Sequence, residues 1–458
     1  MGQTLSKEDF ENKKVLVMGA GKSGIAAVKL LGSVGAIPVM YDENKELDKE
    51  ELLKKLSPVV CDIYAGEISD EIKNECHLLV MSPGIPVDTE FVEGFKKRGI
   101  TVLGEIELAY QFAKGKLIGI TGTNGKTTTT ALTGKIAEDY FGKSFVVGNI
   151  GNPYTVEALN TTGGDITVAE ISSFQLETAI DFHPNVTAIL NISPDHLNRH
   201  HTMENYVECK ESITKNQTKD DACVLNFEDS YLKEFGDKCP ARVIWFSSER
   251  KLGDGFYLEG DDIFKAVNGK SEKLMNIHEM KLLGKHNVEN VMAAIAMTDA
   301  AGIPMDSILK SVKKFTAVEH RIEYVATVDD VDYYNDSKGT NPDAAIKGIQ
   351  AMNRQTILIG GGYDKQNTYD EWIEAFDGKV EWLLLIGQTK EKIDECAKKH
   401  GFNNTILLDT FEEAMNKARE LAKPGMAVLL SPACASWGMF PNYEVRGKEF
   451  KRIVKEFK

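Results

Sequence analysis

The sequence predicts an α/β protein with three domains, on the basis of its length and of two patterns along the chain. A chain of 458 residues exceeds one ordinary core, because a domain takes roughly 150 residues. Short apolar runs alternate with helical segments, which is typical of βαβ units and parallel sheets. Three glycine-rich or Ser-Pro turns open three blocks, and we expect domains at residues 1–104, 105–316 and 317–458.

The predicted strands are apolar runs bounded by turn residues. They lie at residues 14–18, 37–41, 78–81, 116–120, 143–147, 165–171, 185–191, 222–226, 242–246, 356–360, 380–386, 405–408 and 426–430. Polar clusters directly follow six of these strands. Because ligands bind beyond the carboxyl ends of the strands in open α/β sheets, the clusters predict one composite site shared by the three domains.

The bulk composition excludes several classes of partner. With 42% hydrophobic and 27% charged residues, the chain has the composition of a soluble globular protein. A net charge of −15 repels polyanions, so we expect no nucleic-acid partner. No apolar run approaches the ~18 residues of a membrane span, so we expect no membrane partner. Residues 1–6 match a loose N-myristoylation pattern, which we interpret as an ordinary polar N-terminus.

The seven cysteines are scattered along the chain, without a C-x-x-C pair. This distribution favours a reducing, cytoplasmic environment, and it argues against a disulfide framework or a zinc site. We therefore expect free thiols.

A glycine-rich turn closes the first predicted strand, in the stretch VLVMGAGKSG. Gly19, Gly21 and Gly24 match the G-x-G-x-x-G fingerprint, and Asp42 lies 18 residues beyond the last of them. An acidic residue ~20 positions on holds the ribose of NAD, so an NAD-dependent oxidoreductase is one alternative. Nothing downstream offers a hydride-transfer site, and the backbone cradle fits any pyrophosphate, including that of a UDP-sugar.

A second phosphate-type loop lies in the stretch GITGTNGKTTTT, at residues 119–130. A strand, a glycine turn and then Gly125, Lys126 and Thr127 opening a helix form a phosphate cradle. Lys126 would neutralise the β- and γ-phosphates, and Thr127 would bind Mg²⁺. The spacing departs from the P-loop consensus at Ile120, and a threonine-rich helix cap is the alternative. The predicted fold is a Rossmann-like N-terminal domain, a central P-loop-type ATPase domain with a parallel sheet, and a Rossmann-like C-terminal domain.

Three further residues of the central block suit a metal-assisted reaction. Glu170 ends an apolar strand, where a bare carboxylate needs a partner such as the Mg²⁺ of a nucleotide. His196 follows another strand and is a candidate metal ligand, although a lone histidine is also common as a structural residue. Lys210 lies on the apolar face of a helix, seven residues after Met203. It either extends its amine to water, or is a buried lysine of lowered pKa that reacts with CO₂ to give a carbamate.

The third block carries polar turns that suit a small anionic substrate. Asp336, Ser337, Lys338, Thr340 and Asn341 share one loop, and Lys365, Ser431 and Ser436 lie in two others. Glycine turns with one lysine each bind small anions, but turn chemistry alone explains the same composition equally well. From composition, both interpretations stay open.

Taken together, these motifs resemble one family over nearly the whole chain. The stretch GTNGKTT, combined with EISSFQLE, NDSKGTNP, SPACAS and the N-terminal Rossmann-like block, is similar to the ATP-dependent Mur ligases of peptidoglycan synthesis, and among them to the D-glutamate-adding branch. The resemblance implies a bacterial cytoplasmic ligase that supports cell-wall biogenesis, cell shape and division. It would join the L-alanyl carboxylate of UDP-N-acetylmuramoyl-L-alanine to D-glutamate through an acyl phosphate, forming ADP, and would act as a monomer.

The resemblance also implies a role for each residue that matches a family motif. ATP would be bound by Gly122, Thr123, Asn124, Gly125, Lys126, Thr127, Thr128, Asn290, Arg321 and Asp336. The UDP-linked substrate would be bound by Ser23, Ser82, Pro83, Gly84, Asn149, Ser172 and Gln175, and D-glutamate by Lys338, Thr340, Lys365, Ser436 and Tyr443. One Mg²⁺ ion would be held by Thr127 and Glu170 and a second by His196 and carbamylated Lys210, with Mn²⁺ as a substitute. The catalytic residues implied are Lys126, Lys210, His196 and Lys338.

Three alternatives remain beside this interpretation. A sibling ligase would add another amino acid, such as L-alanine, a diamino acid or a D-Ala-D-Ala dipeptide. The NAD-dependent oxidoreductase rests on the first glycine turn alone. A non-enzymatic nucleotide switch would require Lys210 and the third block to be bystanders.

Overall fold

The computed structural model describes residues 7–316 and 318–457, so the myristoylation-like hexapeptide lies outside the described residues. By its internal contacts, the chain divides into two compact units, bounded as Met1–Ile277 with Glu289–Val312, and His278–Val288 with Lys313–Lys458. The first unit holds two sheets and the second holds one. This three-sheet α/β architecture confirms the predicted fold class, while the boundaries at residues 104 and 316 stay predictions.

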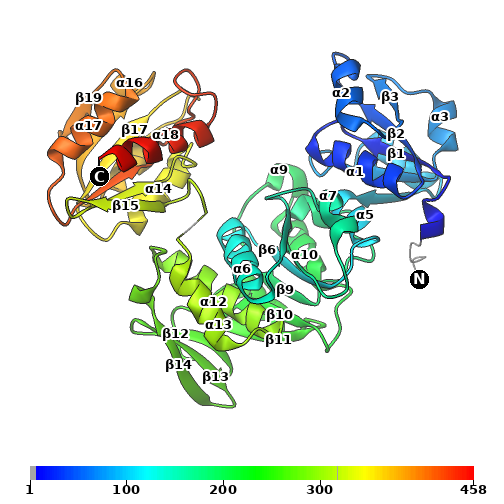
Figure 1. Cartoon of the computed structure of the whole chain (residues 1–458), viewed down its shortest axis with the longest axis horizontal. Helices are drawn as coiled ribbons and strands as arrows, with labels where there is room; N and C mark the ends of the chain where they lie inside the picture. The colour runs from blue at the N-terminus through cyan, green and yellow to red at the C-terminus, as the bar shows by residue number, and fades with distance from the viewer. Residues whose placement is uncertain (1–6, 317, 458) are drawn as a thin grey trace. The chain divides into compact units, whose positions relative to one another are not determined.

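The N-terminal sheet is fully parallel and has the strand order β3-β2-β1-β4-β5 (Figure 1). Its strands are β1 (Lys14–Met18), β2 (Ile37–Asp42), β3 (Asp62–Ala65), β4 (Leu78–Met81) and β5 (Thr101–Gly104). Its helices are η1 (Lys7–Asp9), α1 (Lys22–Ser33), α2 (Lys49–Leu56), α3 (Asp70–Glu75) and α4 (Glu90–Lys97). Val15 and Val17 pack into one apolar cluster, and Leu16 and Met18 into another. Because successive side chains point to opposite faces of a strand, this apolar run is buried on both faces.

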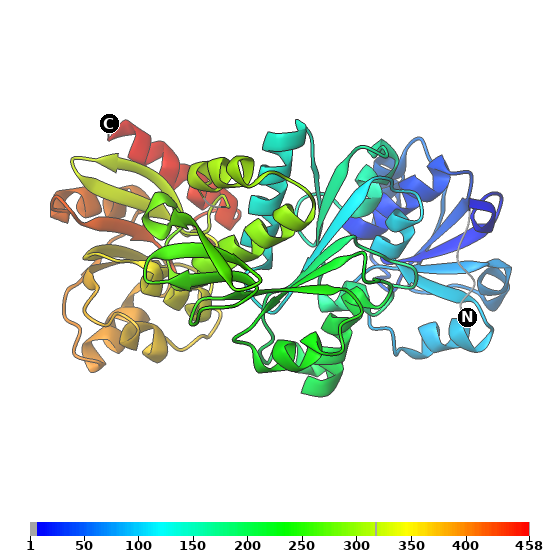
Figure 2. The ribbon, with the colours of Figure 1, turned by 90° about the horizontal axis from the view of Figure 1, so that it is seen from below.

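The central sheet has nine strands in the order β14-β13-β12-β11-β10-β9-β6-β8-β7. They are β6 (Lys116–Thr121), β7 (Phe145–Gly148), β8 (Ile166–Glu170), β9 (Val186–Ile189), β10 (Ala222–Asn226), β11 (Arg242–Ser247), β12 (Gly255–Glu259), β13 (Asp262–Val267) and β14 (Lys270–Asn276). The longer helices are α5 (Glu105–Tyr110), α6 (Lys126–Phe141), α10 (Met203–Glu211), α11 (Ser230–Gly236), α12 (Lys285–Ala300) and α13 (Met305–Lys314). The short ones are α7 (Tyr154–Glu157), η2 (Ala158–Asn160), α8 (Ser173–Leu176), α9 (Leu197–His200), η3 (Ser212–Thr214) and η4 (Ile277–Glu279). Helices cover both faces of this sheet (Figure 2).

The predicted strands of the central sheet are parallel, but its far edge is not. Strands β12 to β14 form antiparallel hairpins that extend the sheet beyond β11, at the lower edge of Figure 1. The sequence did not predict them, because β14 reads KSEKLMN and buries only Met275 fully. An exposed edge strand lacks the continuous apolar run of a buried parallel strand.

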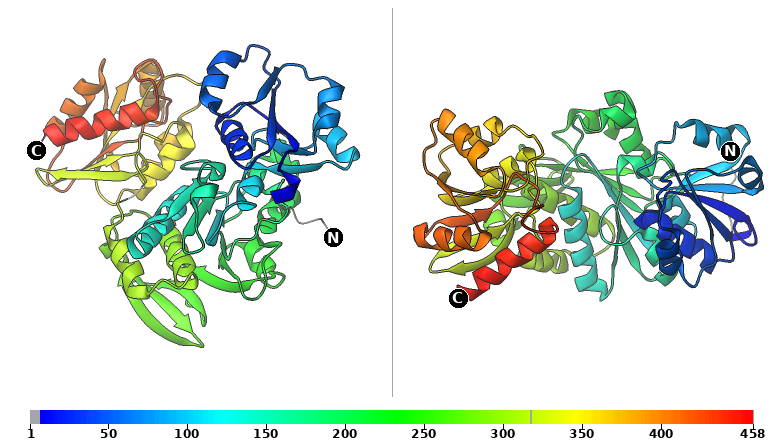
Figure 3. Two further views of the ribbon diagram at one scale, coloured as in Figure 1. Left: turned by 45° about the vertical axis from the view of Figure 1, so that its right-hand side comes forward. Right: turned by 90° about the horizontal axis from the view of Figure 1, so that it is seen from above.

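The second unit contains a six-stranded sheet in the order β15-β16-β20-β17-β18-β19, antiparallel only between β15 and β16. Its strands are β15 (Glu323–Val328), β16 (Val331–Asn335), β17 (Thr356–Gly361), β18 (Val380–Ile386), β19 (Thr405–Leu407) and β20 (Ala427–Leu430). Its helices are α14 (Pro342–Ala351), α15 (Asp370–Glu374), α16 (Lys390–Lys399), α17 (Phe411–Leu421) and α18 (Tyr443–Glu456). Residues of α17 and α18 share one apolar cluster with the sheet, and residues of α14, α15 and α16 share the other. Figure 3 shows α18, in red, along one face of this six-stranded sheet.

Two expectations from the composition, on the cysteines and on membrane-spanning segments, can be compared with the structure. All seven cysteines are free, as expected. Among the described residues, no helix is both long and apolar enough to cross a membrane.

Candidate active site

The phosphate-type loop lies between β6 and α6, at the carboxyl end of a central parallel strand. Its two conformationally demanding positions are Gly122, with φ +144°, and Gly125, with φ +84°. A Cβ atom at Gly125 would lie 2.2 Å from Oδ1 of Asn290, and one at Gly122 would lie 3.1 Å from the Cβ of Leu190. Only glycine fits both positions, since positive φ and close approach exclude a side chain.

The loop after β9 holds the phosphate-type loop in place. The backbone N–H of Thr123 donates to the carbonyl of Asn191 at 2.9 Å, and its hydroxyl donates to the carbonyl of Ser193 at 3.1 Å. The N–H of Asn124 donates to Oδ1 of Asn191 at 2.8 Å. The Tyr206 hydroxyl lies 3.0 Å from the Thr123 hydroxyl. The two loops therefore form one hydrogen-bonded unit, as a preorganised anion site requires.

Two ammonium groups converge on the carbonyl oxygen of Gly122. Nζ of Lys126 donates to it at 2.8 Å and to the carbonyl of Thr123 at 2.9 Å, and Nζ of Lys210 donates to it at 2.9 Å. Lys210 is 2% exposed. Burial, with Lys126 nearby, lowers the pKa of Lys210 to about 7. Lys126 therefore supplies positive charge at this loop, and Lys210 supplies a buried amine that is readily deprotonated.

Glu170 ends β8, the strand beside β6, and is 1% exposed. Its Oε1 accepts a hydrogen bond of 2.7 Å from Nδ2 of Asn149. Its Oε2 is buried, and within residues 7–316 and 318–457 no hydrogen-bond partner reaches it. A buried carboxylate oxygen without a partner is costly, so this atom fits a divalent cation.

His196 lies in the loop after β9 with φ +52°, a left-handed conformation rare for a side-chain-bearing residue. Its ring centroid is 4.9 Å from that of Phe174, and its Nε2 is 3.4 Å from Oδ2 of Asp195. The predicted metal residues Thr127, Glu170 and His196 thus lie at or beyond the carboxyl ends of three adjacent strands, β6, β8 and β9.

A cleft of about 580 Å³ lies beyond β1 and β4, where the strand order of the N-terminal sheet reverses. Five residues predicted to bind the UDP-linked substrate line it, namely Ser23, Ser82, Pro83, Gly84 and Asn149. The hydroxyl of Ser82 is buried and has no hydrogen-bond partner among the described residues. The other two predicted residues, Ser172 and Gln175, do not line the cleft but form a capping box at α8.

The glycine fingerprint has a geometric explanation in this cleft. A Cβ at Gly24 would lie 1.8 Å from the carbonyl oxygen of Gly19, whereas one at Gly21 would meet nothing within 4 Å. Gly21 therefore leaves the N-terminus of α1 open to an anion. Asp42 accepts hydrogen bonds from the N–H groups of Ala20 at 2.8 Å and Asn44 at 2.9 Å. Asp42, whose spacing favoured an NAD site, thus also stabilises the glycine turn.

In the second unit, the predicted residues other than Arg321 and Tyr443 follow the carboxyl ends of three adjacent strands, β16, β20 and β17. Asp336 follows β16 and is 4% exposed; its Oδ2 accepts a 2.7 Å hydrogen bond from Ser431, which follows β20. Burial raises the pKa of Asp336 to about 7. Arg321 lies just before β15 and, at longer range, opposes this shift.

Each predicted substrate lysine of this unit lies over an aromatic ring. Nζ of Lys338 is 5.8 Å from the ring centroid of Tyr443, and Nζ of Lys365 is 4.9 Å from that of Trp437. The Trp437 ring also meets the ring of Tyr363 edge to face, with centroids 5.5 Å apart. Both arrangements hold an ammonium group by cation–π attraction. Ser436 lies beside Trp437 in the chain and is buried.

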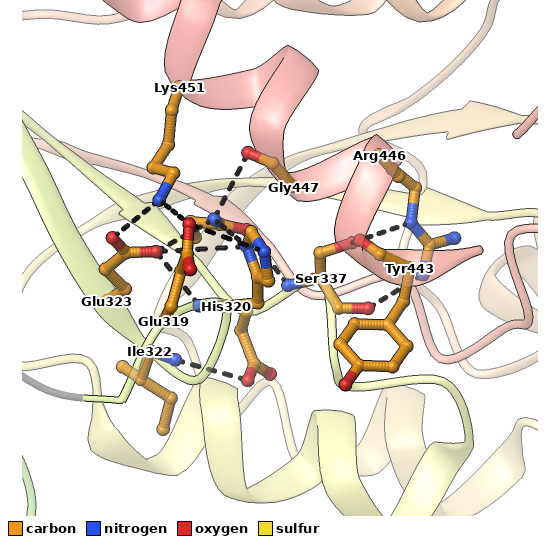
Figure 4. A network of polar contacts seen from close by, with 11 residues as sticks. Glu319, His320, Ile322, Glu323, Ser337, Tyr443, Arg446, Gly447 and Lys451 are labelled. Carbon is orange, nitrogen blue, oxygen red and sulfur yellow. Dashed lines mark hydrogen bonds and ion pairs between the residues drawn. The ribbon is translucent and has the colours of Figure 1, made fainter. Parts of the chain in front are cut away.

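A buried network positions the loop that carries Lys338 (Figure 4). Arg446, 1% exposed, donates from Nε to Oγ of Ser337 at 3.0 Å and from a terminal nitrogen to the carbonyl of Ser337 at 2.8 Å. It also donates to the carbonyl of Cys434 at 3.2 Å. Oγ of Ser337 in turn donates to the carbonyl of Tyr443 at 2.7 Å. Arg446 therefore connects two substrate loops and α18.

Arg446 and Tyr206 are two contact residues that the sequence motifs do not predict. Arg446 lies on the buried face of α18, four residues before Phe450 and seven before Ile453. That spacing could have revealed an arginine on an apolar face. Tyr206 is a buried residue of α10, and no pattern in the sequence indicates its bond to Thr123.

Family models match all three parts of the chain. A Mur ligase MurD-like N-terminal domain covers residues 13–104, a Mur ligase middle domain covers residues 120–298, and a Mur ligase glutamate ligase domain covers residues 320–434. The chain belongs to the Mur ligase family. The predicted resemblance is thereby confirmed, and the glycine turn of the first domain is part of a Mur ligase domain.

Close relatives of this Mur ligase bear one name. The UDP-N-acetylmuramoylalanine–D-glutamate ligase of Lachnospira eligens is 58% identical, over 97% of this chain and 99% of its own length. The ligases of the same name from Lachnoclostridium phytofermentans and Clostridioides difficile are 54% and 44% identical, each over 98% of this chain and at least 99% of their own.

Solved Mur ligases share the fold at low sequence identity. MurC from Thermotoga maritima has a TM-score of 0.59 at 18% identity, covering 97% of this chain and 100% of its own. MurF from Acinetobacter baumannii has a TM-score of 0.60 at 15% identity, covering 96% and 93%.

Proposed function

We propose that this Mur ligase joins the L-alanyl carboxylate of UDP-N-acetylmuramoyl-L-alanine to the amine of D-glutamate, with conversion of ATP to ADP and phosphate. The observation that carries the phosphoryl-transfer chemistry is the convergence of Lys126 and Lys210 on the Gly122 carbonyl, beside the unpartnered carboxylate oxygen of Glu170. The choice of D-glutamate rests on the name shared by the full-length relatives.

The reaction has two steps. An oxygen of the L-alanyl carboxylate attacks the γ-phosphorus of ATP, which releases ADP and leaves an acyl phosphate. The amine of D-glutamate then attacks the acyl carbon, and the tetrahedral intermediate loses phosphate and a proton to give the amide. Lys126 and the N-terminus of α6 stabilise the negative charge that develops on the phosphoryl oxygens.

Two magnesium ions fit the donor set of the central domain. Thr127 and Glu170 would hold one, and His196 and Lys210, as a carbamate, would hold the second, with Mn²⁺ as a substitute. These ions would neutralise phosphate charge in the first step. The lowered pKa of Lys210 favours the carbamate, because an unprotonated amine is the form that reacts with CO₂.

The remaining substrate contacts are proposed residue by residue from the family motifs. For ATP they are Gly122, Thr123, Asn124, Gly125, Thr128, Asn290, Arg321 and Asp336, with Lys338 at the reacting phosphate. For the UDP-linked substrate they are Ser23, Ser82, Pro83, Gly84, Asn149, Ser172 and Gln175. For D-glutamate they are Lys338, Thr340, Lys365, Ser436 and Tyr443. We further propose that the enzyme is a cytoplasmic monomer.

Phosphate release in the presence of ATP, Mg²⁺, UDP-N-acetylmuramoyl-L-alanine and one amino acid at a time tests this proposal. We expect turnover with D-glutamate and none with L-glutamate, L-alanine, a diamino acid or D-Ala-D-Ala. Turnover with another member of the panel would make the chain a sibling ligase. Turnover with none, together with a change in NADH absorbance, would favour the oxidoreductase.

The Trp437 ring should strengthen the hold of Lys365 on a carboxylate of D-glutamate. Trp437→Leu removes the cation–π contact, which is worth about 0.5–1 kcal/mol at an exposed site. A loss of this free energy corresponds to a rise in KM for D-glutamate of about 2–5-fold. We expect kcat and KM for ATP to stay unchanged. Trp437→Phe keeps an aromatic face and should retain most of the affinity. Equal KM values for the leucine variant and the parent would contradict this role.

A further inference from the structure

Two neighbouring helices of the second unit present metal-ligating side chains at matched spacing. On α15, Asp370 and Glu374 are four residues apart, and at the end of α16, Cys396 and His400 are also four apart. Residues with this spacing lie on the same face of a helix. The N–H of His400 donates to the carbonyl of Cys396 at 3.2 Å, so the helical geometry extends to His400.

The four side chains face one another across the two helices. One ligand atom each of Asp370, Cys396 and His400 lies within 4.8 Å of the other two. Nε2 of His400 is 2.9 Å from Oδ1 of Asp370, and its Nδ1 is 3.6 Å from Oε1 of Glu374. The two ring nitrogens of His400 therefore meet two different carboxylates.

We propose that Asp370, Cys396 and His400 bind a zinc ion, with water as the fourth ligand. Zinc prefers sulfur, nitrogen and carboxylate ligands in a tetrahedron, with bonds of about 2.0–2.3 Å. Ligand atoms around such an ion lie ~3.5 Å apart by that geometry, which small rotations of these partly exposed side chains reach from the observed spacing. On binding, the Cys396 thiol and His400 give up any proton at the ligating atom.

Glu374 has a separate role in this site. A histidine that ligates zinc commonly donates its other ring N–H to a carboxylate, which fixes the tautomer and the ring orientation. Oε1 of Glu374 lies on the Nδ1 side of His400, opposite Asp370. Glu374 is thus a positioning residue that leaves Nε2 for the metal.

The site is accessible to an ion from solvent and lies outside the proposed substrate contacts. The side chains of Asp370 and Glu374 are 46% and 64% exposed. Nζ of Lys399 lies 3.8 Å from Oδ1 of Asp370 and is the cation that zinc must displace. The absence of C-x-x-C pairs in the sequence argues against a zinc site built from cysteine pairs. It does not bear on a site whose ligands lie four residues apart on two helices.

Binding of Zn²⁺ and of Co²⁺ to the full-length, chelator-treated protein tests the proposal, with Mg²⁺ in excess to fill sites that prefer oxygen ligands. We expect one Zn²⁺ per chain, and with Co²⁺ a near-ultraviolet thiolate charge-transfer band together with the visible spectrum of a tetrahedral ion. Zinc should also raise the Tm of the protein. Absence of the thiolate band and of zinc binding would overturn the proposal.

Four variants resolve the ligands. Cys396→Ser should abolish the thiolate band, and His400→Gln should weaken zinc binding at least 10-fold; both should keep the metal-free Tm, because these side chains are partly exposed. Lys399→Ala should tighten binding, since it removes the competing cation. The control is His77→Gln, an exposed histidine of the N-terminal domain, which should bind zinc like the parent. Equal zinc affinity in Cys396→Ser and the parent would show binding elsewhere and refute the site.

Discussion

Lys210→Ala should reduce D-glutamate-dependent phosphate release by about 10²–10³-fold or more, the range for losing one preorganised charge at a reacting centre. Lys210 is buried, and its Nζ bonds to the carbonyl of Gly122 in the phosphate-type loop. The substitution removes both this bond and the carbamate proposed to hold Mg²⁺. Steady-state phosphate release with all substrates measures the effect, and an unchanged rate would make Lys210 a bystander of a nucleotide switch.

Chemical rescue separates a carbamate from an ammonium at this position. The alanine variant leaves a small space beside the loop, and formate or acetate should enter it and restore part of the rate. A small amine should not restore it. Lys210→Met is the matched control, because it fills the same space without charge and should be inactive with or without the carboxylate. Rescue by the amine alone would contradict the carbamate.

The strand ends of this protein could be predicted from sequence, because a buried parallel strand is a continuous apolar run that stops at a polar turn. Glu170 and His196 accordingly lie where the sequence placed them, at the end of β8 and after β9, whereas β16, the strand before Lys338, was not predicted. Their contacts could not be predicted, because they join residues far apart in the chain. The bond between Thr123 and Tyr206 spans 83 positions, for example.

Other misses have the same physical origin. Strands β12 to β14 are amphipathic or polar. They therefore lack the continuous apolar run by which the other strands of this sheet were predicted. Ser172 and Gln175 also cap α8, a local role that their family motif did not indicate, and their contact with the substrate stays a prediction. The histidine and cysteine of the proposed zinc site look unremarkable alone, since their partners Asp370 and Glu374 come from another helix. Pairing between elements is a property of the folded chain.

Arg446→Met should destabilise the second unit by about 2–6 kcal/mol, because two buried carbonyl groups lose their donor, at about 1–3 kcal/mol for each. The guanidinium satisfies the carbonyls of Ser337 and Cys434 in a buried site, and methionine fills the volume without donating a hydrogen bond. Because Ser337 adjoins Lys338, we also expect KM for D-glutamate to rise. Three of the four tryptophans lie in this unit, so urea unfolding followed by tryptophan fluorescence reports mainly on its stability.

The same helix supplies the control for that prediction. Arg452 on α18 is half exposed and pairs with Glu449 and Glu456, and surface pairs contribute only about 0–1 kcal/mol. Arg452→Met should therefore leave both the urea midpoint and KM near those of the parent. Arg446→Lys keeps the charge but loses the planar fork of donors, so it should fall between the two. If Arg446→Met unfolds at the same urea concentration as Arg452→Met, the buried arginine does not hold the two substrate loops together.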